Sequence, residues 1–255
     1  MNIRILGAHN CESDTTRLSG ILIDDKIAVD AGSLSSSVSL DVQENLTALL
    51  LTHQHYDHIR DIMSVGMNNY LADKKVKIYS IQSVYDVLNY LFDSNFYHDF
   101  MKRPQGNPVI NYTTIEPHQS FKVEDYEVVA IPVKHSVPAV GFRITSNKGK
   151  ELFYTGDTGP EVSECWEQIN PDLLIIECTA SDRFYEFGKR AGHLTTGLLK
   201  EALAEFKELK GYLPLVITVH MSPRLEEEIG IELAAVSEEL GIQIQMGYEG
   251  MEVKL

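Results

Sequence analysis

The 255-residue sequence is poor in basic residues relative to acidic ones. It has 22 Lys and Arg against 37 Asp and Glu, which gives a formal net charge of −15. Proteins that bind long nucleic acids contact the phosphate backbone with clustered Lys and Arg, and these contacts supply much of their affinity. The acidic balance therefore argues against a general nucleic-acid binder. It is easier to reconcile with a small anion bound at a locally positive site.

Long apolar runs are also missing. No apolar stretch approaches the ~18 to 20 residues that cross a bilayer, so we expect no membrane span. The first residues resemble a strand and lack the charged and apolar segments of a signal peptide. Only three cysteines occur, Cys11, Cys165 and Cys178, without metal-type spacing. These features predict reduced thiols and a cytoplasmic location.

Short apolar runs alternate with amphipathic segments along the whole chain. We predict strands at 3–6, 20–23, 26–30, 46–51, 76–80, 109–115, 126–132, 140–146, 151–155, 172–177, 215–219, 242–246 and 251–254. We predict helices at 57–72, 82–92, 161–168, 195–209 and 223–239. Because no low-complexity linker divides the chain, residues 1–255 are expected to form one layered α/β domain.

Three histidines and an aspartate fall within six residues, in the segment LTHQHYDHIRD. They are His53, His55, Asp57 and His58, between an apolar strand and a helix. Side chains two residues apart in an extended segment point the same way, so His53 and His55 can share a metal ion. Asp57 and His58 lie at the turn into the helix and can face a second ion. Such ligands suit zinc, manganese or iron.

Three later strands end in further candidate ligands. His135, Asp157 and His220 each follow an apolar run. A polar residue at the end of a buried strand can emerge at the edge of a sheet, where the sites of α/β proteins collect. Together with the first cluster, these residues predict a dinuclear metal site.

The motif THQHYDH, followed in order by His135, Asp157 and His220, resembles the metallo-β-lactamase-fold hydrolase superfamily over nearly the whole chain. The resemblance implies a four-layer αββα sandwich with two divalent metal ions in a cleft between the sheet edges. The implied ligands are His53, His55 and His135 for one ion and Asp57, His58 and His220 for the other, with Asp157 bridging them. Zinc is the expected metal, and manganese and iron are alternatives. Two divalent ions would supply the local positive charge that the overall composition lacks.

The segment FGKRAGHLTTGLLKEAL at 187–203 narrows the resemblance to one branch. It resembles the His-Leu-Thr element of the phosphodiesterase branch, which includes transfer-RNA 3′-processing enzymes (RNase Z-like) and class II cyclic-nucleotide phosphodiesterases. The resemblance implies that His193 lies beside the metals and assists the leaving oxygen. His193 and Asp57 are thus the candidate catalytic residues. Thr195 or Thr196 is the expected N-cap of the next helix.

Two further features leave alternatives open. The aromatic segment 91–108 resembles part of the cyclic-nucleotide phosphodiesterase-like bacterial proteins. Its Phe96, Tyr97 and Phe100 could stack on a nucleobase, or they could anchor the segment to the core. By the same resemblance Asp30 could hydrogen-bond a metal-binding histidine, or it could be a simple turn residue.

The sequence predicts a dinuclear-metal-dependent phosphodiesterase that acts on a small nucleotide such as a cyclic nucleotide. The alternatives within the fold are a lactonase or thioesterase and an RNase Z-like ribonuclease. A nucleotide-binding protein without turnover is the alternative from another class. We expect a small phosphodiester substrate, no long nucleic acid and no membrane, and the resembled branches suggest a homodimer.

Overall fold

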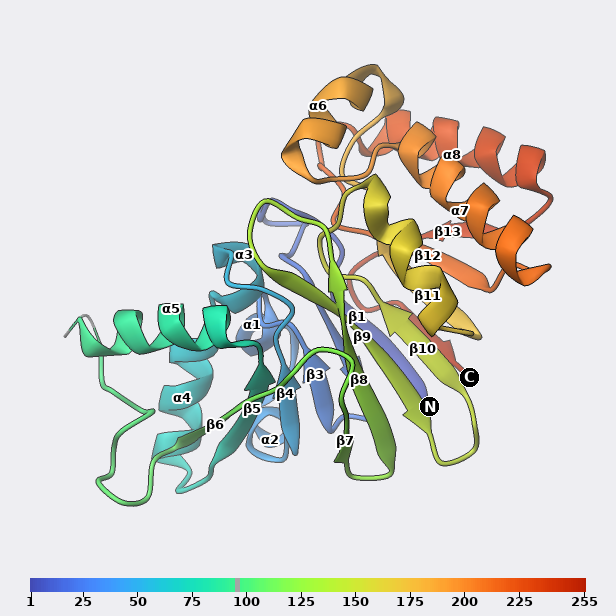
Figure 1. Ribbon diagram of the computed structural model, residues 1–255. Helices are drawn as coiled ribbons and strands as arrows, with labels where there is room; N and C mark the ends of the chain where they lie inside the picture. Colours follow the sequence, from blue (N-terminus) through green and yellow to red (C-terminus); the bar gives the residue numbers. More distant parts are fainter. Residues whose placement is uncertain (95–96) are drawn as a thin grey trace.

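The computed structural model describes residues 1–94 and 97–255, so Phe96 lies outside the described residues. The described strands form two seven-stranded sheets. Figure 1 shows the two sheets face to face with helices on both outer sides, in the order helix, sheet, sheet, helix. The predicted αββα sandwich is confirmed.

The first sheet comes mainly from the N-terminal half, in the strand order β14-β1-β2-β3-β4-β5-β6. Its strands are β1 (Asn2–Gly7), β2 (Gly20–Ile23), β3 (Ile27–Val29), β4 (Ala48–Leu50), β5 (Val76–Ser80), β6 (Ile110–Thr114) and β14 (Glu252–Lys254). The helices of this half are α1 (Leu34–Ser37), α2 (Leu40–Glu44), α3 (Tyr56–Ile59), α4 (Ile62–Leu71) and α5 (Gln82–Asp93). Strands β3 to β6 run parallel, so their carboxyl ends meet at one edge.

The second sheet has the order β13-β12-β11-β10-β9-β8-β7. Its strands are β7 (Ser120–Val123), β8 (Tyr126–Val133), β9 (Ala139–Ser146), β10 (Glu151–Tyr154), β11 (Leu173–Glu177), β12 (Leu215–Val219) and β13 (Ile244–Met246). Its helices are the 3₁₀ segments η1 (Pro160–Gln168) and η2 (Asp182–Phe184), followed by α6 (Tyr185–Ala191), α7 (Thr196–Lys210) and α8 (Glu226–Leu240). Strands β10 to β13 are parallel, and their carboxyl ends also share one edge.

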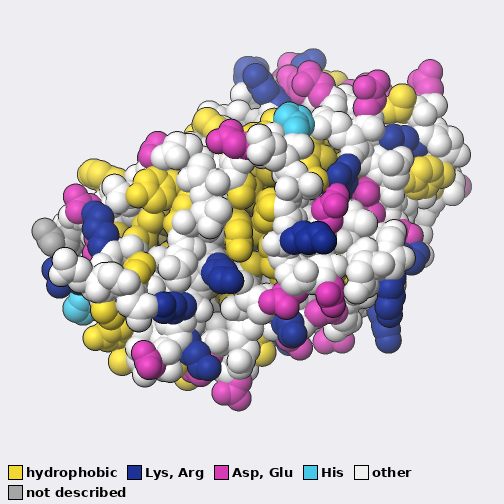
Figure 2. Space-filling view, turned by 60° about the horizontal axis from the view of Figure 1, so that its bottom comes forward, with side chains coloured by type: hydrophobic (Ala, Val, Ile, Leu, Met, Phe, Trp, Pro, Cys, Tyr) yellow, Lys and Arg dark blue, Asp and Glu magenta, His cyan; other side chains and the backbone are white. Residues whose placement is uncertain are grey.

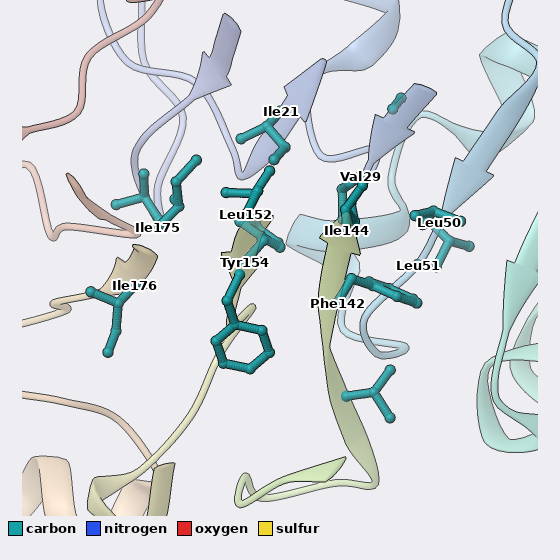
Figure 3. Close-up of a cluster of buried hydrophobic side chains, with 14 of the residues drawn as sticks. Ile21, Val29, Leu50, Leu51, Phe142, Ile144, Leu152, Tyr154, Ile175 and Ile176 are labelled. Carbon is teal, nitrogen blue, oxygen red and sulfur yellow. The ribbon is translucent and has the colours of Figure 1, made fainter. Parts of the chain in front are cut away.

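One continuous set of buried side chains joins the two sheets. Figure 3 shows part of it, with Ile21 and Val29 from the first sheet and Ile144 and Leu152 from the second. These four side chains have at most 1% of their surface exposed. Strands that are covered on both faces are expected to have apolar residues at successive positions. The strands that carry these four side chains follow that pattern. The core therefore holds the strand ends, and the loops that follow them, in fixed positions.

The predicted helix 57–72 is wrong as a single element. The chain forms α3 and then α4, with a break at Arg60 and Asp61. Asp61 is buried, and its carboxylate accepts hydrogen bonds from the backbone N–H and the hydroxyl of Ser35. This tertiary contact lies at the break between α3 and α4, and a single sequence does not show it. The segment predicted as a helix at 161–168 is the 3₁₀ helix η1, and the short elements α1, α2, α6 and β7 were missed.

The structure bears on two predictions, that the chain binds no long nucleic acid and that it has no membrane span. Figure 2 shows apolar side chains across the middle of one face, with basic and acidic side chains interspersed around them. The residues drawn on this face form no continuous basic stripe of the kind that a long nucleic acid requires. In the part of the chain that the structure describes, every helix is too short or too polar to cross a bilayer.

Candidate active site

Seven candidate ligands come from four loops that meet where the parallel strands of the two sheets end. His53, His55, Asp57 and His58 lie in and after the loop that follows β4. His135 lies between β8 and β9, Asp157 follows β10, and His220 follows β12. The structure thus brings together all seven side chains, and their role as metal ligands stays a prediction.

The first group joins three imidazoles and one carboxylate. His55 Nδ1 lies 3.1 Å from His53 Nε2 and 3.1 Å from His135 Nε2. Asp157 Oδ2 lies 3.7 Å from His53 Nε2 and 3.9 Å from His135 Nε2. All four potential ligand atoms are within 4.8 Å of one another. Three nitrogens this close, pointing at one another, are arranged as ligands of a common ion.

The second group shares Asp157 with the first. Asp157 Oδ1 lies 3.0 Å from His58 Nε2, and Asp157 Oδ2 lies 3.3 Å from His220 Nε2. Asp57 Oδ2 completes the group at 3.1 Å from His220 Nε2. Because Asp157 belongs to both groups, its carboxylate can bridge two ions.

Two buried atoms show that the cluster fits metal ions. Among the described residues, His58 Nε2 and Asp157 Oδ1 are buried, lie 3.0 Å apart and make no hydrogen bond to any other group. Without an ion, the proton on His58 is what joins them. A cation could take the place of that proton and bind both atoms, and the nitrogen and oxygen donors suit zinc, manganese or iron.

The electrostatics of the cluster favour the ligating forms of most of its members. Burial lowers the pKa of His53 well below its usual value, and burial also lowers the pKa of His55 and of His135. Burial alone would raise the pKa of Asp157, but nearby His220 and His58 outweigh it and hold that pKa well below its usual value. Neutral imidazoles and ionised carboxylates are the species that bind metal ions.

His58 behaves differently from these histidines. Burial would lower its pKa, but the carboxylates of Asp157 and Asp30 raise it well above the usual value. In the metal-free cluster a proton on His58 therefore supplies positive charge between two buried carboxylates. A divalent cation would bring positive charge to the same place.

A buried hydrogen-bond network around Asp30 contacts histidines of both groups. Asp30 Oδ2 lies 2.7 Å from His58 Nδ1 and accepts hydrogen bonds from the hydroxyls of Thr52 (2.9 Å) and Tyr154 (3.2 Å). Thr52 Oγ1 also lies 3.0 Å from His53 Nδ1. The predicted hydrogen bond that Asp30 accepts from a clustered histidine is confirmed. The left-handed backbone of Asp30, with φ of 61°, places this carboxylate beneath the cluster.

His193 lies beside the seven candidate ligands. Its ring stacks on that of His220 at 5.3 Å and meets that of His135 edge-on at 4.9 Å. Its Nδ1 is 2.9 Å from Oε1 of the fully buried Glu177. Burial lowers the pKa of His193, but the Glu177 carboxylate outweighs it and raises the pKa to about 9. Of the two predicted N-caps of α7, Thr195 is the one that caps it, and its hydroxyl accepts from the N–H of Leu198.

Glu177, Thr179, Thr52 and Tyr154 are site residues that sequence reasoning missed. Glu177 accepts from the Thr179 hydroxyl at 2.6 Å, and Thr179 Oγ1 lies 2.8 Å from His220 Nδ1. The available signal was the run LLIIE, in which Glu177 ends an apolar strand as Asp157 nearly does. The other three carry only hydroxyl groups, which mark no site in a sequence.

The aromatic segment 91–108 does not supply three stacking rings. Phe100 is 2% exposed and contacts Tyr70 and Phe92, so of the two alternatives left open for it the stacking one is excluded. The ring of Tyr97 is 5.8 Å from that of Phe100. Figure 1 shows the described part of this segment beside α4 and α5. Packing of Phe100 against two helices favours the anchoring alternative for that residue.

Comparisons with known proteins agree with the fold. A curated octanoyltransferase from Porphyromonas gingivalis is 25% identical over 219 residues, which cover 82% of this chain but only 38% of that protein. A ribonuclease Z from Methanocaldococcus jannaschii is 23% identical over 233 residues, covering 71% of this chain and 70% of that protein. The crystal structure of unliganded yeast PDE1 has a TM-score of 0.84 at 16% identity, covering 100% of this chain and 99% of that one.

The family assignment rests on a family model that matches most of the chain. The family model described as a beta-lactamase superfamily domain matches residues 23–221. That range contains all seven clustered side chains and His193. With the αββα sandwich and the clustered histidines and aspartates, the match shows that this chain belongs to the beta-lactamase superfamily and has the metallo-β-lactamase fold.

Proposed function

We propose that this chain is a metal-dependent hydrolase that cleaves small phosphodiesters, with cyclic nucleotides as the first candidates. The supporting observation is the position of His193, which Glu177 holds beside the ligand cluster. The curated relatives called ribonuclease Z support a phosphodiester bond as the target. Zinc is the proposed metal, with manganese or iron as alternatives, and two ions are proposed from the two groups that share Asp157.

The two ligand groups would hold the ions as the predicted ligand sets assign them. His53, His55 and His135 would bind one ion, Asp57, His58 and His220 the other, and Asp157 would bridge them. Bound there, divalent ions supply Lewis-acid polarisation of the phosphoryl oxygens and a nucleophile at neutral pH. Asp57, at the half-buried rim of the cluster, can also accept a proton from the attacking water.

His193 is placed to assist the leaving group. Its Nδ1 is directed to Glu177, which leaves Nε2 as the nitrogen available to a substrate. From that atom a proton can pass to the leaving oxygen, or a hydrogen bond can hold a phosphoryl oxygen. A lactonase or thioesterase would not need this imidazole, so His193 separates the main proposal from that alternative. The homodimer, the cytoplasmic location and the single domain stay predictions.

The decisive experiment compares bond types in the purified, metal-loaded protein. We expect cleavage of bis-p-nitrophenyl phosphate and of at least one cyclic nucleotide. The variant His193→Ala is expected to lower kcat by about 10²–10⁴-fold with unchanged metal content. The variant His118→Ala is the matched control, because His118 is exposed and bonded to Gln168 away from the cluster.

Two other results would each support one of the alternatives. Cleavage of a lactone or a thioester without cleavage of any diester, at a rate that His193→Ala leaves unchanged, would establish the alternative. Tight nucleotide binding in calorimetry with no product from any of these substrates would support a binding protein instead.

A further inference from the structure

Among the seven candidate ligands, all of them described residues, only His220 has a left-handed backbone, with φ of 61°. A residue with a side chain seldom adopts this conformation, which costs about 1–3 kcal/mol and persists only where the surrounding structure determines it. His220 follows directly after β12, so its backbone sets the direction in which its ring leaves the strand end. The contacts that hold the residues next to His220 therefore help to position this ligand.

The residue after His220 is held by the first sheet. The N–H of Met221 donates to the carbonyl of Ala8 at 3.0 Å, and the N–H of Asn10 donates to the carbonyl of Met221 at 3.2 Å. Segment 8–10 directly follows β1, whereas His220 directly follows β12 of the second sheet. The two hydrogen bonds therefore join the sheets next to a candidate ligand, and they form only while segment 8–10 keeps its place.

The side chain of Glu249 fastens segment 8–10. Its Oε1 atom accepts hydrogen bonds from the N–H of Arg17 at 2.8 Å and from the N–H of Ala8 at 3.4 Å. The same oxygen lies 2.7 Å from Nδ1 of His9. Ala8 and Arg17 lie near opposite ends of the loop between β1 and β2. One carboxylate oxygen thus holds together the two ends of the loop that binds Met221.

The backbone of Glu249 is anchored between the same two strands, β1 and β12. Glu249 lies in the crossover 247–251, where the chain passes from β13 in the second sheet to β14 in the first. One hydrogen bond ties the start of this crossover to β12, and another ties its end to β1. They run from the N–H of Gly247 to the carbonyl of Thr218 and from the N–H of Gly250 to the carbonyl of Ile5, each 2.8 Å.

We propose that Glu249 is a positioning residue for His220, acting through segment 8–10 and Met221. The proposal rests on the part of the proposed function that makes His220 a metal ligand. Because His220 belongs to the second ligand group and not to the first, loss of the Glu249 contacts should weaken the ion of the second group and spare the other. A residue needed only for the stability of the fold would affect both ions alike.

Calorimetric titration of the metal-free protein with zinc measures the two binding steps. We expect Glu249→Met, which removes the accepting oxygen at similar side-chain length, to weaken one step by about tenfold or more and to leave the other unchanged. The weakened step should be the one that His220→Ala abolishes. Glu249→Gln keeps an oxygen at the same position and should retain most of the affinity. Glu252→Met, the same change at an exposed position in β14, should bind both ions as the wild type does.

Amide hydrogen exchange in the metal-free protein tests the positioning without any ion. Glu249→Met should speed exchange at the N–H of Met221 by about tenfold or more, because the loop that accepts its hydrogen bond is released. The N–H of Thr155, which donates to Ile175 in β11, should exchange as in the wild type. If Glu249→Met does not fold, Glu249→Asp serves instead, because its carboxylate is one methylene group too short to reach all three partners.

The outcomes separate this proposal from the proposed function. Unchanged exchange at Met221, equal weakening of both zinc-binding steps, or no weakening of either would overturn the positioning role of Glu249. Selective weakening of the step that depends on His220 would support that role even if no diester were cleaved. Binding of two zinc ions by a wild type that cleaves no diester would count against the proposed function alone.

Discussion

The hydroxyl of Thr52 connects one histidine of each ligand group. It lies 3.0 Å from His53 Nδ1 and 2.9 Å from Asp30 Oδ2, and the same oxygen of Asp30 lies 2.7 Å from His58 Nδ1. A hydroxyl has one proton, so when Thr52 donates to Asp30 it accepts from His53 Nδ1. Both rings then keep Nε2 free for a metal ion. One carboxylate thereby orients a histidine in each group.

Removing that hydroxyl should weaken metal binding without unfolding the protein. We expect Thr52→Val, which nearly preserves the volume of this buried side chain, to lower metal affinity by about 10–100-fold. Competition with a chelator of known affinity would measure it. Thr218→Val is the control, because Thr218 is also fully buried and its hydroxyl contacts no clustered histidine. Equal affinity in the two variants would disprove the role of Thr52.

His9 and two glutamates form a second buried arrangement of charges, which uses none of the seven candidate ligands. Its Nδ1 lies 2.7 Å from Glu249 Oε1, and its Nε2 lies 3.4 Å from Glu226 Oε2. Burial lowers the pKa of His9, but the two carboxylates outweigh it and raise that pKa above 6.5. Burial would raise the pKa of Glu249, but the hydrogen bond with His9 outweighs it and lowers that pKa below 4.5.

The stability of the fold should therefore depend on His9 in a pH-dependent way. A raised folded-state pKa stabilises the protein fully below pH 6.5, and this stabilisation is lost as pH rises through the folded-state value. The lowered pKa of Glu249 stabilises above pH 4.5. Urea unfolding should show wild type exceeding His9→Gln by about 1–2 kcal/mol more at pH 5.5 than at pH 9.5. A difference independent of pH would contradict this assignment.

At the scale of residues, the sequence predicted the clustered residues that carry distinctive groups, namely imidazoles and carboxylates. Strand ends marked His135, Asp157 and His220, and the spacing of THQHYDH marked the rest of the cluster. Glu177 follows the same rule, since it ends the apolar run LLIIE. The role of Thr52 could not be predicted, because a threonine at a strand end looks the same whether its hydroxyl faces solvent or a buried carboxylate.

Helix α6 positions two histidines through the residue that ends it. Gly192 has a left-handed backbone with φ of 76°, and its carbonyl oxygen lies 2.9 Å from His135 Nδ1. A Cβ at this position would meet the Cα of His135 at 3.2 Å. His193 follows directly, so the end of this helix fixes both the loop that carries His135 and the imidazole beside it.

Two glycines with nearly the same backbone conformation provide a matched test of α6. Gly211 ends α7 with φ of 77°, and a Cβ there would meet no described atom within 4 Å. We expect Gly211→Ala to cost about 1–2 kcal/mol of stability and to leave metal affinity unchanged. Gly192→Ala should cost at least as much and also lower metal affinity by about tenfold or more. Unchanged metal affinity in Gly192→Ala would show that α6 does not position His135.

At the scale of elements, sequence periodicity predicted most strands and the long helices. It failed where tertiary contacts decided the outcome, as at Asp61, whose burial beside Ser35 divides the predicted helix 57–72. It also missed α6, because its residues form no continuous apolar face: Phe187 is 60% exposed. Such short elements depend on their surroundings more than on intrinsic propensity.

At the scale of the molecule, the two sheets bring residues far apart in sequence to one edge. Asp57 and His220 are separated by 163 positions, yet their side chains lie 3.1 Å apart. Local patterns predicted that both would emerge at strand ends. Only the resemblance to a known fold predicted that those ends would meet, because strand order depends on contacts that a single sequence does not display. The net charge of the chain is negative, but a centre that holds two cations would be locally positive and would attract a small anion.

The central claim is that this cluster binds two divalent ions through a shared Asp157. The most direct measurement is metal content per chain, by inductively coupled plasma mass spectrometry after dialysis of the purified protein against zinc or manganese. We predict two ions for the wild type and at most one for Asp157→Ala, with His118→Ala retaining two. One ion or none in the wild type, or two ions in Asp157→Ala, would contradict the account.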